Sequence, residues 1–140
     1  MRPATSLIVC LSTVVTFSCG ENGDVTEPIQ NVSFSTEVQP IFTANCISLG
    51  CHIGPNPQLG MDLTVGQTIA SIVGVESVQS ALLRVAPGQS SSSYLYQKVS
   101  GGQITSGGSG DRMPPPPRLA LDDNELEVIR VWIEEGALNN

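Results

Sequence analysis

The sequence predicts a small all-α domain with a few short helices and long loops. Apolar residues recur at helical spacing near both ends of the expected domain, and the alternating pattern of a half-buried strand is weak throughout. The 14 glycines and 10 prolines among 140 residues assign much of the chain to loops. Aromatic residues make up only 4 % of the chain, which is consistent with a core that a large apolar cofactor completes.

Residues 1–18 have the pattern of a secretory signal peptide. Arg2 precedes an uncharged, mostly apolar run over residues 7–17, which is short for a membrane span. Cys19 follows at the place of a lipoprotein's acylated cysteine, with ordinary cleavage or an uncleaved anchor as the alternatives. We therefore expect an exported protein of the periplasm or cell envelope. If Cys19 is modified, the acyl anchor would hold the protein to a lipid bilayer, and we expect this to be the outer membrane.

The rest of the chain divides into a flexible tether over residues 19–32 and one domain over residues 33–140. The formal net charge of −7 and the pI near 4.4 argue against nucleic-acid binding, which needs a basic face. An acidic surface favours basic protein partners through electrostatic steering.

The first expected helix covers residues 33–46. Its apolar side chains recur near i, i+3, i+4 and i+8 and so form one face, which consists of Val38, Ile41, Phe42 and Cys46. Ser35 is the expected N-cap. Pro40 either kinks the first turns or marks the true start, because proline is tolerated in the first turn of a helix but not in its interior.

Two shorter helices are expected in the middle of the domain. The first covers residues 67–74 and is weakly marked. The second covers residues 91–101: a serine caps its start, Leu95 and Val99 share one face, and Gly101 ends it.

Long loops connect these helices. Residues 52–60 carry two prolines and two glycines, and residues 101–111 are rich in glycine and serine, so we expect a flexible loop there. Residues 112–118 contain four consecutive prolines, which predict stiff, extended backbone.

The last helix has the strongest signals in the chain. Asp122 is the expected N-cap, Glu125 completes a capping box, and Leu121 and Leu126 fit a hydrophobic staple. Gly136 fits the end of the helix. The apolar stripe of this helix is expected to consist of Leu126, Ile129 and Ile133, widened by Val128 and Trp132.

The only histidine in the chain follows a cysteine directly, in the arrangement Cys46-x₄-Cys51-His52. Covalent haem attachment needs two thiols that add to the two vinyl groups and a histidine beside the second thiol, usually as C-x-x-C-H. Here the Cys-His adjacency is intact and the linker is two residues longer. Such a linker must bulge from a helical turn, and Gly50 supplies the backbone freedom for it. The motif therefore indicates one covalent haem c.

Three other interpretations of these residues stay open. The two cysteines of an exported chain can form a disulfide that closes a small loop. A structural zinc site would need further ligands, and the expected domain has no other cysteine or histidine. A Cys-His catalytic dyad is disfavoured, because adjacent residues rarely present nucleophile and base to each other.

With no second histidine, methionine is the expected sixth ligand of the iron. Met113 lies in a stiff proline segment, far enough along the chain from His52 to return to the opposite face of the haem. Met61 lies only nine residues beyond His52 between two leucines, where a core methionine fits.

The other expected contacts are weaker. Arg84 and Arg112 are candidate partners of the haem propionates. Pro55 or Pro57 is expected to offer the carbonyl that accepts the second N–H of the histidine. Trp132 is expected in the core, with a contact to the ring as a further possibility.

The segments EVQPIFTANC and CHIG, VAPGQSSSSYLYQKVSG, RMP and LDDNELEVIRVWIEEGA, in this order, resemble a bacterial family of small secreted monohaem cytochromes c. This family is class I-like and is related to the cytochrome c-like domains of planctomycete-type proteins. The likeness covers residues 34–137. It implies a cytochrome c-like fold whose first and last helices pack across each other, with haem on Cys46 and Cys51 and with His52 and Met113 as axial ligands.

The function expected from these observations is electron carriage rather than catalysis. A haem that protein ligands cap on both iron faces exchanges single electrons with redox partner proteins and has no free site for a substrate. If Met113 does not bind the iron, a haem enzyme or a gas or redox sensor with an open iron site is the alternative. The remaining alternative is a haem-free, disulfide-containing interaction domain.

Overall fold

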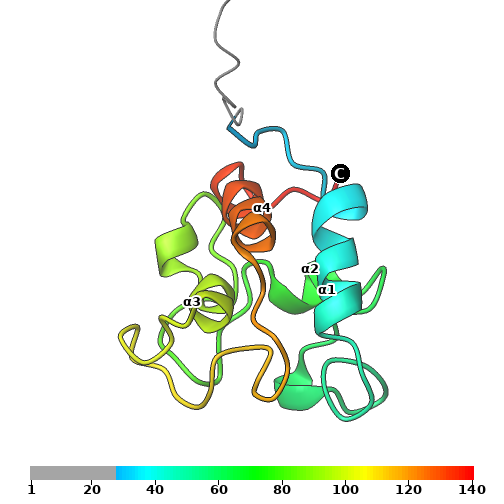
Figure 1. Ribbon diagram of the computed structural model, residues 1–140, viewed down its shortest axis with the longest axis vertical. Helices are drawn as coiled ribbons and strands as arrows, with labels where there is room; N and C mark the ends of the chain where they lie inside the picture. The colour runs from blue at the N-terminus through cyan, green and yellow to red at the C-terminus, as the bar shows by residue number, and fades with distance from the viewer. Residues whose placement is uncertain (1–27) are drawn as a thin grey trace, which may run out of the picture.

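The computed structural model describes residues 28–140, and Figure 1 shows their arrangement. The predicted signal peptide, Cys19 and the tether up to residue 27 lie outside the described residues. The described chain is helical, as predicted: its α-helices are α1 (Gln39–Asn45), α2 (Thr68–Ile72), α3 (Tyr94–Ser100) and α4 (Asp123–Glu134). Within residues 28–140, extended pairing is limited to three isolated bridges between residues 73 and 93.

Pro40 marks the start of the first α-helix, which is one of the two roles predicted for it. A π-helical turn, Phe34–Val38, leads directly into α1, where Pro40 occupies the first turn. Ser33 caps the turn by accepting from the backbone N–H of Thr36, so the predicted cap at Ser35 is wrong by two residues. The predicted apolar face is confirmed, because Val38 and Phe42 are fully buried.

α4 has the predicted capping box. The Asp122 carboxylate accepts from the Glu125 N–H, and the Glu125 carboxylate accepts from the Asp122 N–H. Gly136, with φ of +102°, follows the end of the helix. The buried face is shifted slightly from the prediction, because Val131 joins it and Leu126 is only partly buried.

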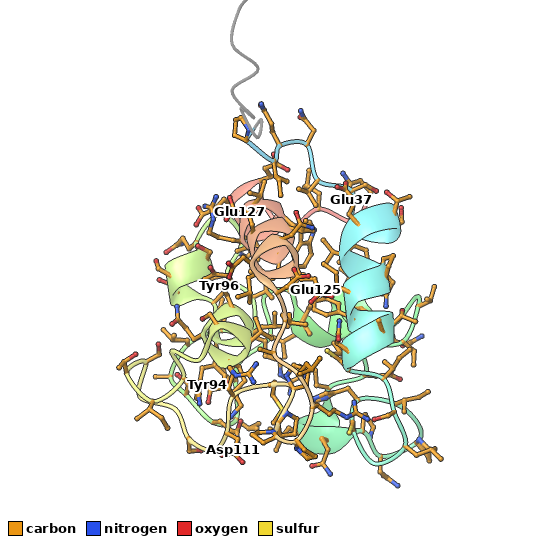
Figure 2. The ribbon with its side chains drawn as sticks, viewed as in Figure 1. Glu37, Tyr94, Tyr96, Asp111, Glu125 and Glu127 are labelled. Atoms are coloured by element: carbon orange, nitrogen blue, oxygen red, sulfur yellow. The ribbon has the colours of Figure 1, made fainter. Side chains whose placement is uncertain are left out.

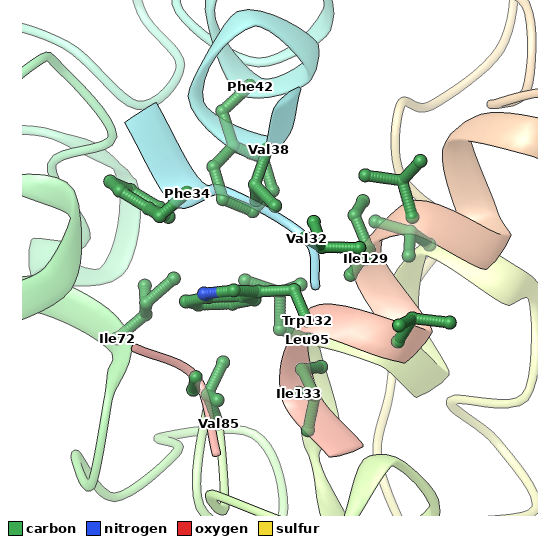
Figure 3. Packing of buried hydrophobic residues seen from close by; sticks show 14 of the residues in the cluster. Val32, Phe34, Val38, Phe42, Ile72, Val85, Leu95, Ile129, Trp132 and Ile133 are labelled. Carbon is green, nitrogen blue, oxygen red and sulfur yellow. The ribbon is translucent and has the colours of Figure 1, made fainter. Parts of the chain in front are cut away.

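α4 and the first helix pack against each other in antiparallel directions (Figure 1). The rings of Phe34, at the start of the π-helical turn, and Trp132, near the end of α4, lie 5.3 Å apart. At the other end of the pair, the Asn45 amide donates to the Glu125 carboxylate at 3.0 Å. Figure 3 shows Trp132 in the middle of the core, between Phe34 and Ile72. The predicted core position of Trp132 is confirmed by its exposure of 1 %.

The two ends of the described chain are joined by hydrogen bonds. The Glu135 carboxylate accepts from the N–H groups of Asn31 and Val32 at 2.6 and 2.8 Å. Asn140 accepts from the Phe34 N–H through its side chain at 2.7 Å. Val32 is buried, and Ile29 packs against the core. Residues before position 33, in the segment predicted as the tether, therefore also contact the domain.

Two details of the middle segments differ from the sequence prediction. Ser93 does precede α3, but its hydroxyl bonds to the backbone of Ala86 and Gln89 instead of capping the helix. The proline segment turns rather than staying extended, since the Arg118 N–H donates to the Pro115 carbonyl at 3.0 Å. None of the helices in the described part of the chain is long and apolar enough to cross a membrane.

Candidate functional site

A cavity of about 370 Å³ lies between the loops of the domain. Two of the loops that line it, over residues 46–60 and 112–118, lie at the end of the domain opposite the point where residue 28 enters (Figure 1). Its walls come from four segments: residues 42–63, 77–84, 94–99 and 113–118. Most of the lining side chains are apolar. The structure brings all four residues of the predicted haem site into this lining, namely Cys46, Cys51, His52 and Met113.

The linker between the two cysteines folds into a compact turn. The Cys51 N–H donates to the Ser48 carbonyl at 2.9 Å, and Gly50 adopts the left-handed φ of +80° expected for the bulge. The His52 N–H then donates to the Cys46 carbonyl at 3.4 Å. In a helical C-x-x-C-H turn, this bond would be the ordinary link from residue i+4 to residue i. The turn therefore accommodates the two extra residues of the linker outside the helical turn. As a result, the hydrogen bond from the His52 N–H to the Cys46 carbonyl is the same as in a C-x-x-C-H turn.

Both cysteines are free thiols on the cavity wall. Burial raises the pKa of the Cys46 thiol to about 12, and the nearby Arg118 guanidinium opposes this increase. The Ser48 hydroxyl donates to the Cys51 sulfur at 3.2 Å. Cys46 is thus held as a neutral thiol at neutral pH, and Cys51 has a polar neighbour in the turn.

The His52 ring is fixed by one backbone carbonyl. Its Nδ1 lies 3.1 Å from the Met61 oxygen, and since a carbonyl can only accept, Nδ1 carries the proton. This leaves Nε2 as the basic nitrogen for a metal. Burial lowers the pKa of the imidazole, which favours the neutral form that binds metals. The prediction that Pro55 or Pro57 supplies this carbonyl is wrong, because the chain reverses at residues 58–60 and returns Met61 to the histidine.

The two methionines reach the cavity from different segments. Met61 belongs to the loop that binds Nδ1 of His52, and it also packs against the core. Met113 belongs to the proline loop, where its N–H donates to the Lys98 carbonyl at the end of α3 at 2.9 Å. Both methionines are partly buried and line the cavity, so the structure provides two candidate thioethers with different backbone supports.

The charged residues that line the cavity are all cations. The described part of the chain contains five of the six basic residues; the sixth is Arg2. It contains ten of the thirteen acidic residues; the other three are Glu21, Asp24 and Glu27. Three of the five basic residues line the cavity and none of the ten acids does; the three are Arg84, Lys98 and Arg118. Within residues 28–140 the one ion pair, Arg130 with Glu127, lies on α4. The cavity therefore has a positive lining without a carboxylate counter-charge.

Lys98 is buried like Arg84, with 8 % exposure. Its ammonium donates to the Ser109 carbonyl at 2.6 Å and lies 5.9 Å from the centre of the Tyr94 ring. Burial lowers the pKa of this amine, and the Asp111 carboxylate opposes the shift. Figure 2 shows Tyr94 and Asp111 together at the cavity end of the molecule. An ammonium has three N–H donors, so Lys98 can still bind an anionic group in the cavity.

Sequence reasoning missed Lys98 and Arg118. One signal was available for Lys98, because it lies three residues after Leu95 and directly before Val99, on the buried face of α3. Arg118 reaches across the cysteine linker, donating to the Asn45 carbonyl and the Ser48 hydroxyl at 3.3 and 2.9 Å. That contact joins segments 70 residues apart and has no local sequence signal.

The two predicted propionate contacts occupy different environments. Arg84 lines the cavity, but its guanidinium donates to three backbone carbonyls. Arg112 precedes Met113 and is not among the lining residues, and its Nη1 is buried without a hydrogen-bond partner. Trp132 also lies outside the lining, so the expected role in the core is the one the structure supports.

Among residues 28–140 there is no group of three or more His, Cys, Asp or Glu side chains that could hold a metal ion by themselves. Comparison of the chain with protein-family models, with curated proteins and with solved structures gives no match.

Proposed function

We propose that the protein is an exported monohaem c-type cytochrome that carries single electrons between redox partner proteins. The observation that carries this proposal is the convergence of Cys46, Cys51, His52 and Met113 on one apolar cavity whose charged lining is entirely cationic. A cytochrome c-like fold and the cytochrome family resemblance belong to the same proposal. The antiparallel contact between the first and last helices supports them.

The cavity and its donor set fit haem c. Its volume of about 370 Å³ lies in the range of small-molecule sites, and its apolar walls suit a porphyrin ring. The buried cations would then have the carboxylate partners that the chain does not provide, in the form of the two propionates. Lys98 and Arg118 join Arg84 as candidates for this contact.

The two thiols would hold the ring covalently. Each S–H adds across a vinyl C=C bond: the sulfur bonds to one vinyl carbon and the hydrogen goes to the other. This addition consumes one thiol and one alkene and needs no oxidant or reductant. The free thiols of Cys46 and Cys51, both on the cavity wall, are suited to it. The 48–51 turn keeps both close to His52.

His52 and Met113 would bind the iron from opposite sides. Met61 offers its carbonyl to Nδ1, so its backbone lies behind the imidazole, away from Nε2. This argues against Met61 as the ligand of the other face and favours Met113, which the loop after α3 supports. When bound, the haem supplies reversible one-electron chemistry at iron, at a potential that methionine ligation raises.

Localisation is part of the proposal. The predicted signal peptide supports export, and Cys19 supports a lipid anchor in the cell envelope, on the outer membrane. Residue 28 enters the domain at the end opposite the cavity loops over residues 46–60 and 112–118, which would keep the site clear of an anchor (Figure 1).

The test is the mass of the denatured protein after expression with a c-type maturation system. A covalent haem survives denaturation, so we expect one haem mass on the peptide that spans Cys46 and Cys51. An unshifted mass, with a Cys46–Cys51 disulfide recovered by digestion, would favour the interaction-domain alternative. A haem protein that binds carbon monoxide freely in its reduced form would favour the enzyme or sensor alternative.

A further inference from the structure

Arg84 is a buried arginine whose guanidinium donates only to backbone carbonyls, two in one loop and one in α2. Its Nη2 donates to the Leu59 carbonyl at 2.7 Å, and its Nη1 donates to the carbonyls of Gly60 and Ser71 at 3.3 and 2.7 Å. The side chain is 9 % exposed, and within residues 28–140 it has no carboxylate within ion-pair distance. Arg84 therefore ties the 59–60 turn to α2, because Ser71 belongs to that helix.

The turn that Arg84 holds is conformationally unfavourable. Leu59 and Gly60 both adopt the left-handed region, with φ of +56° and +63°. A leucine in this region costs on the order of 1 kcal/mol or more and persists only when its surroundings hold it there. Leu59 is itself half exposed, so side-chain packing contributes little to the hold. Two backbone bonds close the turn, from the Gly60 N–H to the Pro57 carbonyl at 2.9 Å and from the Met61 N–H to the Gln58 carbonyl at 3.1 Å. The guanidinium bond to the Leu59 carbonyl is the side-chain contact that holds it from outside.

The residue after this turn is Met61, whose carbonyl binds Nδ1 of His52. The path from Arg84 to the imidazole thus runs through three consecutive residues: the carbonyls of Leu59 and Gly60 accept from the guanidinium, and the carbonyl of Met61 accepts from His52. A neighbouring bond, from the Leu63 N–H to the His52 carbonyl at 3.0 Å, ties the same loop to the histidine backbone.

We infer that Arg84 is a positioning residue for His52: it holds the 59–61 turn so that the Met61 carbonyl fixes the ring and keeps the proton on Nδ1, which leaves Nε2 unprotonated on a residue that lines the cavity. The importance of this orientation for iron binding rests on the proposed function, whereas the clamp itself consists of contacts within the chain. Arg84 is thereby assigned a role in addition to the propionate contact predicted from the sequence.

The experiment measures the exchange of the His52 Nδ1 proton with solvent by NMR of the reduced, haem-bearing protein. We expect this proton to exchange at least about tenfold faster in Arg84→Lys than in the wild type, since one hydrogen bond contributes roughly a factor of ten. The Trp132 Nε1 proton, which is bonded to the Leu138 carbonyl at 2.9 Å in the distant core, is the internal reference and should not change. Arg130→Lys, on the exposed face of α4, is the matched control and should leave both protons unchanged.

Equal acceleration of both protons in Arg84→Lys would mean a general structural role and would overturn the inference, as would no change in either proton. If Arg84→Lys does not fold, the wild type still decides the question. The guanidinium protons of Arg84 should then exchange as slowly as the His52 proton. Free exchange of the former beside a protected His52 would exclude the clamp. If the wild type carries no haem mass, the proposed function fails, and the same two protons in the haem-free protein still test the clamp.

Discussion

Apolar side chains fill the interior where the two ends of the chain meet, whereas the loops of the same domain enclose a cavity of about 370 Å³. We call residues 28–41 and 121–140 the terminal region, and residues 42–63, 77–84 and 94–118 the cavity region. In the terminal region, buried polar groups have partners: the Gln39 amide donates to the Leu63 carbonyl and accepts from the Thr68 hydroxyl. In the cavity region, Arg84 and Lys98 are buried cations with no carboxylate within ion-pair distance.

This difference indicates which part of the domain the chain can fill and neutralise with its own side chains, without a ligand. An uncompensated buried charge costs free energy, and apolar walls around an unfilled space lose packing contacts. The terminal region has no uncompensated buried charge, and its hollow of about 330 Å³ is lined in part by polar residues, among them Glu135 and Asn140. The cavity region has both, and a flat apolar ligand that carries two carboxylates would remove both. Changes that remove the ligand should therefore affect the cavity region, and changes in the helix pair should affect the whole domain.

The largest expected effect is that of Cys46→Ala combined with Cys51→Ala. Without thiols no thioether can form, so the haem mass should be lost completely from the denatured protein. Hydrogen exchange should then become faster in residues 42–63 and 94–118 while α4 stays protected. Ser48→Ala is the matched control in the same turn and should retain the haem mass. Equal loss of protection in both regions would show that they do not differ in their dependence on the ligand.

The next change distinguishes the two sulfurs of the cavity. Met113→Ala should abolish the weak charge-transfer band at the red end of the oxidised spectrum, lower the reduction potential and admit imidazole or carbon monoxide. Met61→Leu should leave the band in place, because this volume-conserving exchange keeps the backbone carbonyl and costs less than about 1.5 kcal/mol. Loss of the band in the Met61 variant alone would identify Met61 as the ligand.

Trp132→Ala tests the terminal region. Trp132 is 1 % exposed and packs on Phe34, so its removal leaves a cavity between α4 and the first helix. We expect a loss of about 3–5 kcal/mol in the free energy of unfolding. Urea titration followed by circular dichroism measures it, with haem-bearing and haem-free protein affected alike. A loss confined to the haem-free protein would contradict the separation of the two regions.

Lys98→Met should have the smallest effect, and its sign should depend on the ligand. In haem-free protein the change removes a buried, unpaired charge, so the free energy of unfolding should rise by about 1 kcal/mol. In haem-bearing protein it removes a carboxylate partner, so stability should fall by about 1–3 kcal/mol. Arg130→Met, whose guanidinium pairs with Glu127 on the surface, should leave both values nearly unchanged. The same sign in both forms would show that no anion of the ligand reaches Lys98.

The sequence was sufficient to predict much of the helix pair in the terminal region, because the signals of these helices are local. The caps at Asp122 and Glu125, the proline in the first turn of α1 and the apolar face through Val38 and Phe42 each depend on residues within a few positions. The bulge at Gly50 was predictable for the same reason.

The walls of the cavity were not predictable in this way, because distant segments form them. The Met61 carbonyl reaches His52 only after a reversal that includes a left-handed leucine, which no propensity favours. The serine run before α3 predicts a cap, but the hydroxyl of Ser93, the residue next to the helix, bonds to the backbone of Ala86 and Gln89. From the sequence, Lys98 is indistinguishable from a solvated lysine. Only the packing of α3 shows that it lines the cavity.

The joined ends of the described chain have a mechanical consequence. Force applied at residue 28 would act first on the bonds from Asn31 and Val32 to Glu135 and on those from Phe34 and Ser35 to Asn140. α4 and the first helix would carry that load as a pair, and the loops around His52 lie beyond them. A pull transmitted from the proposed anchor would thus be borne by the terminal region before it could distort the cavity region, where the proposed electron exchange would take place.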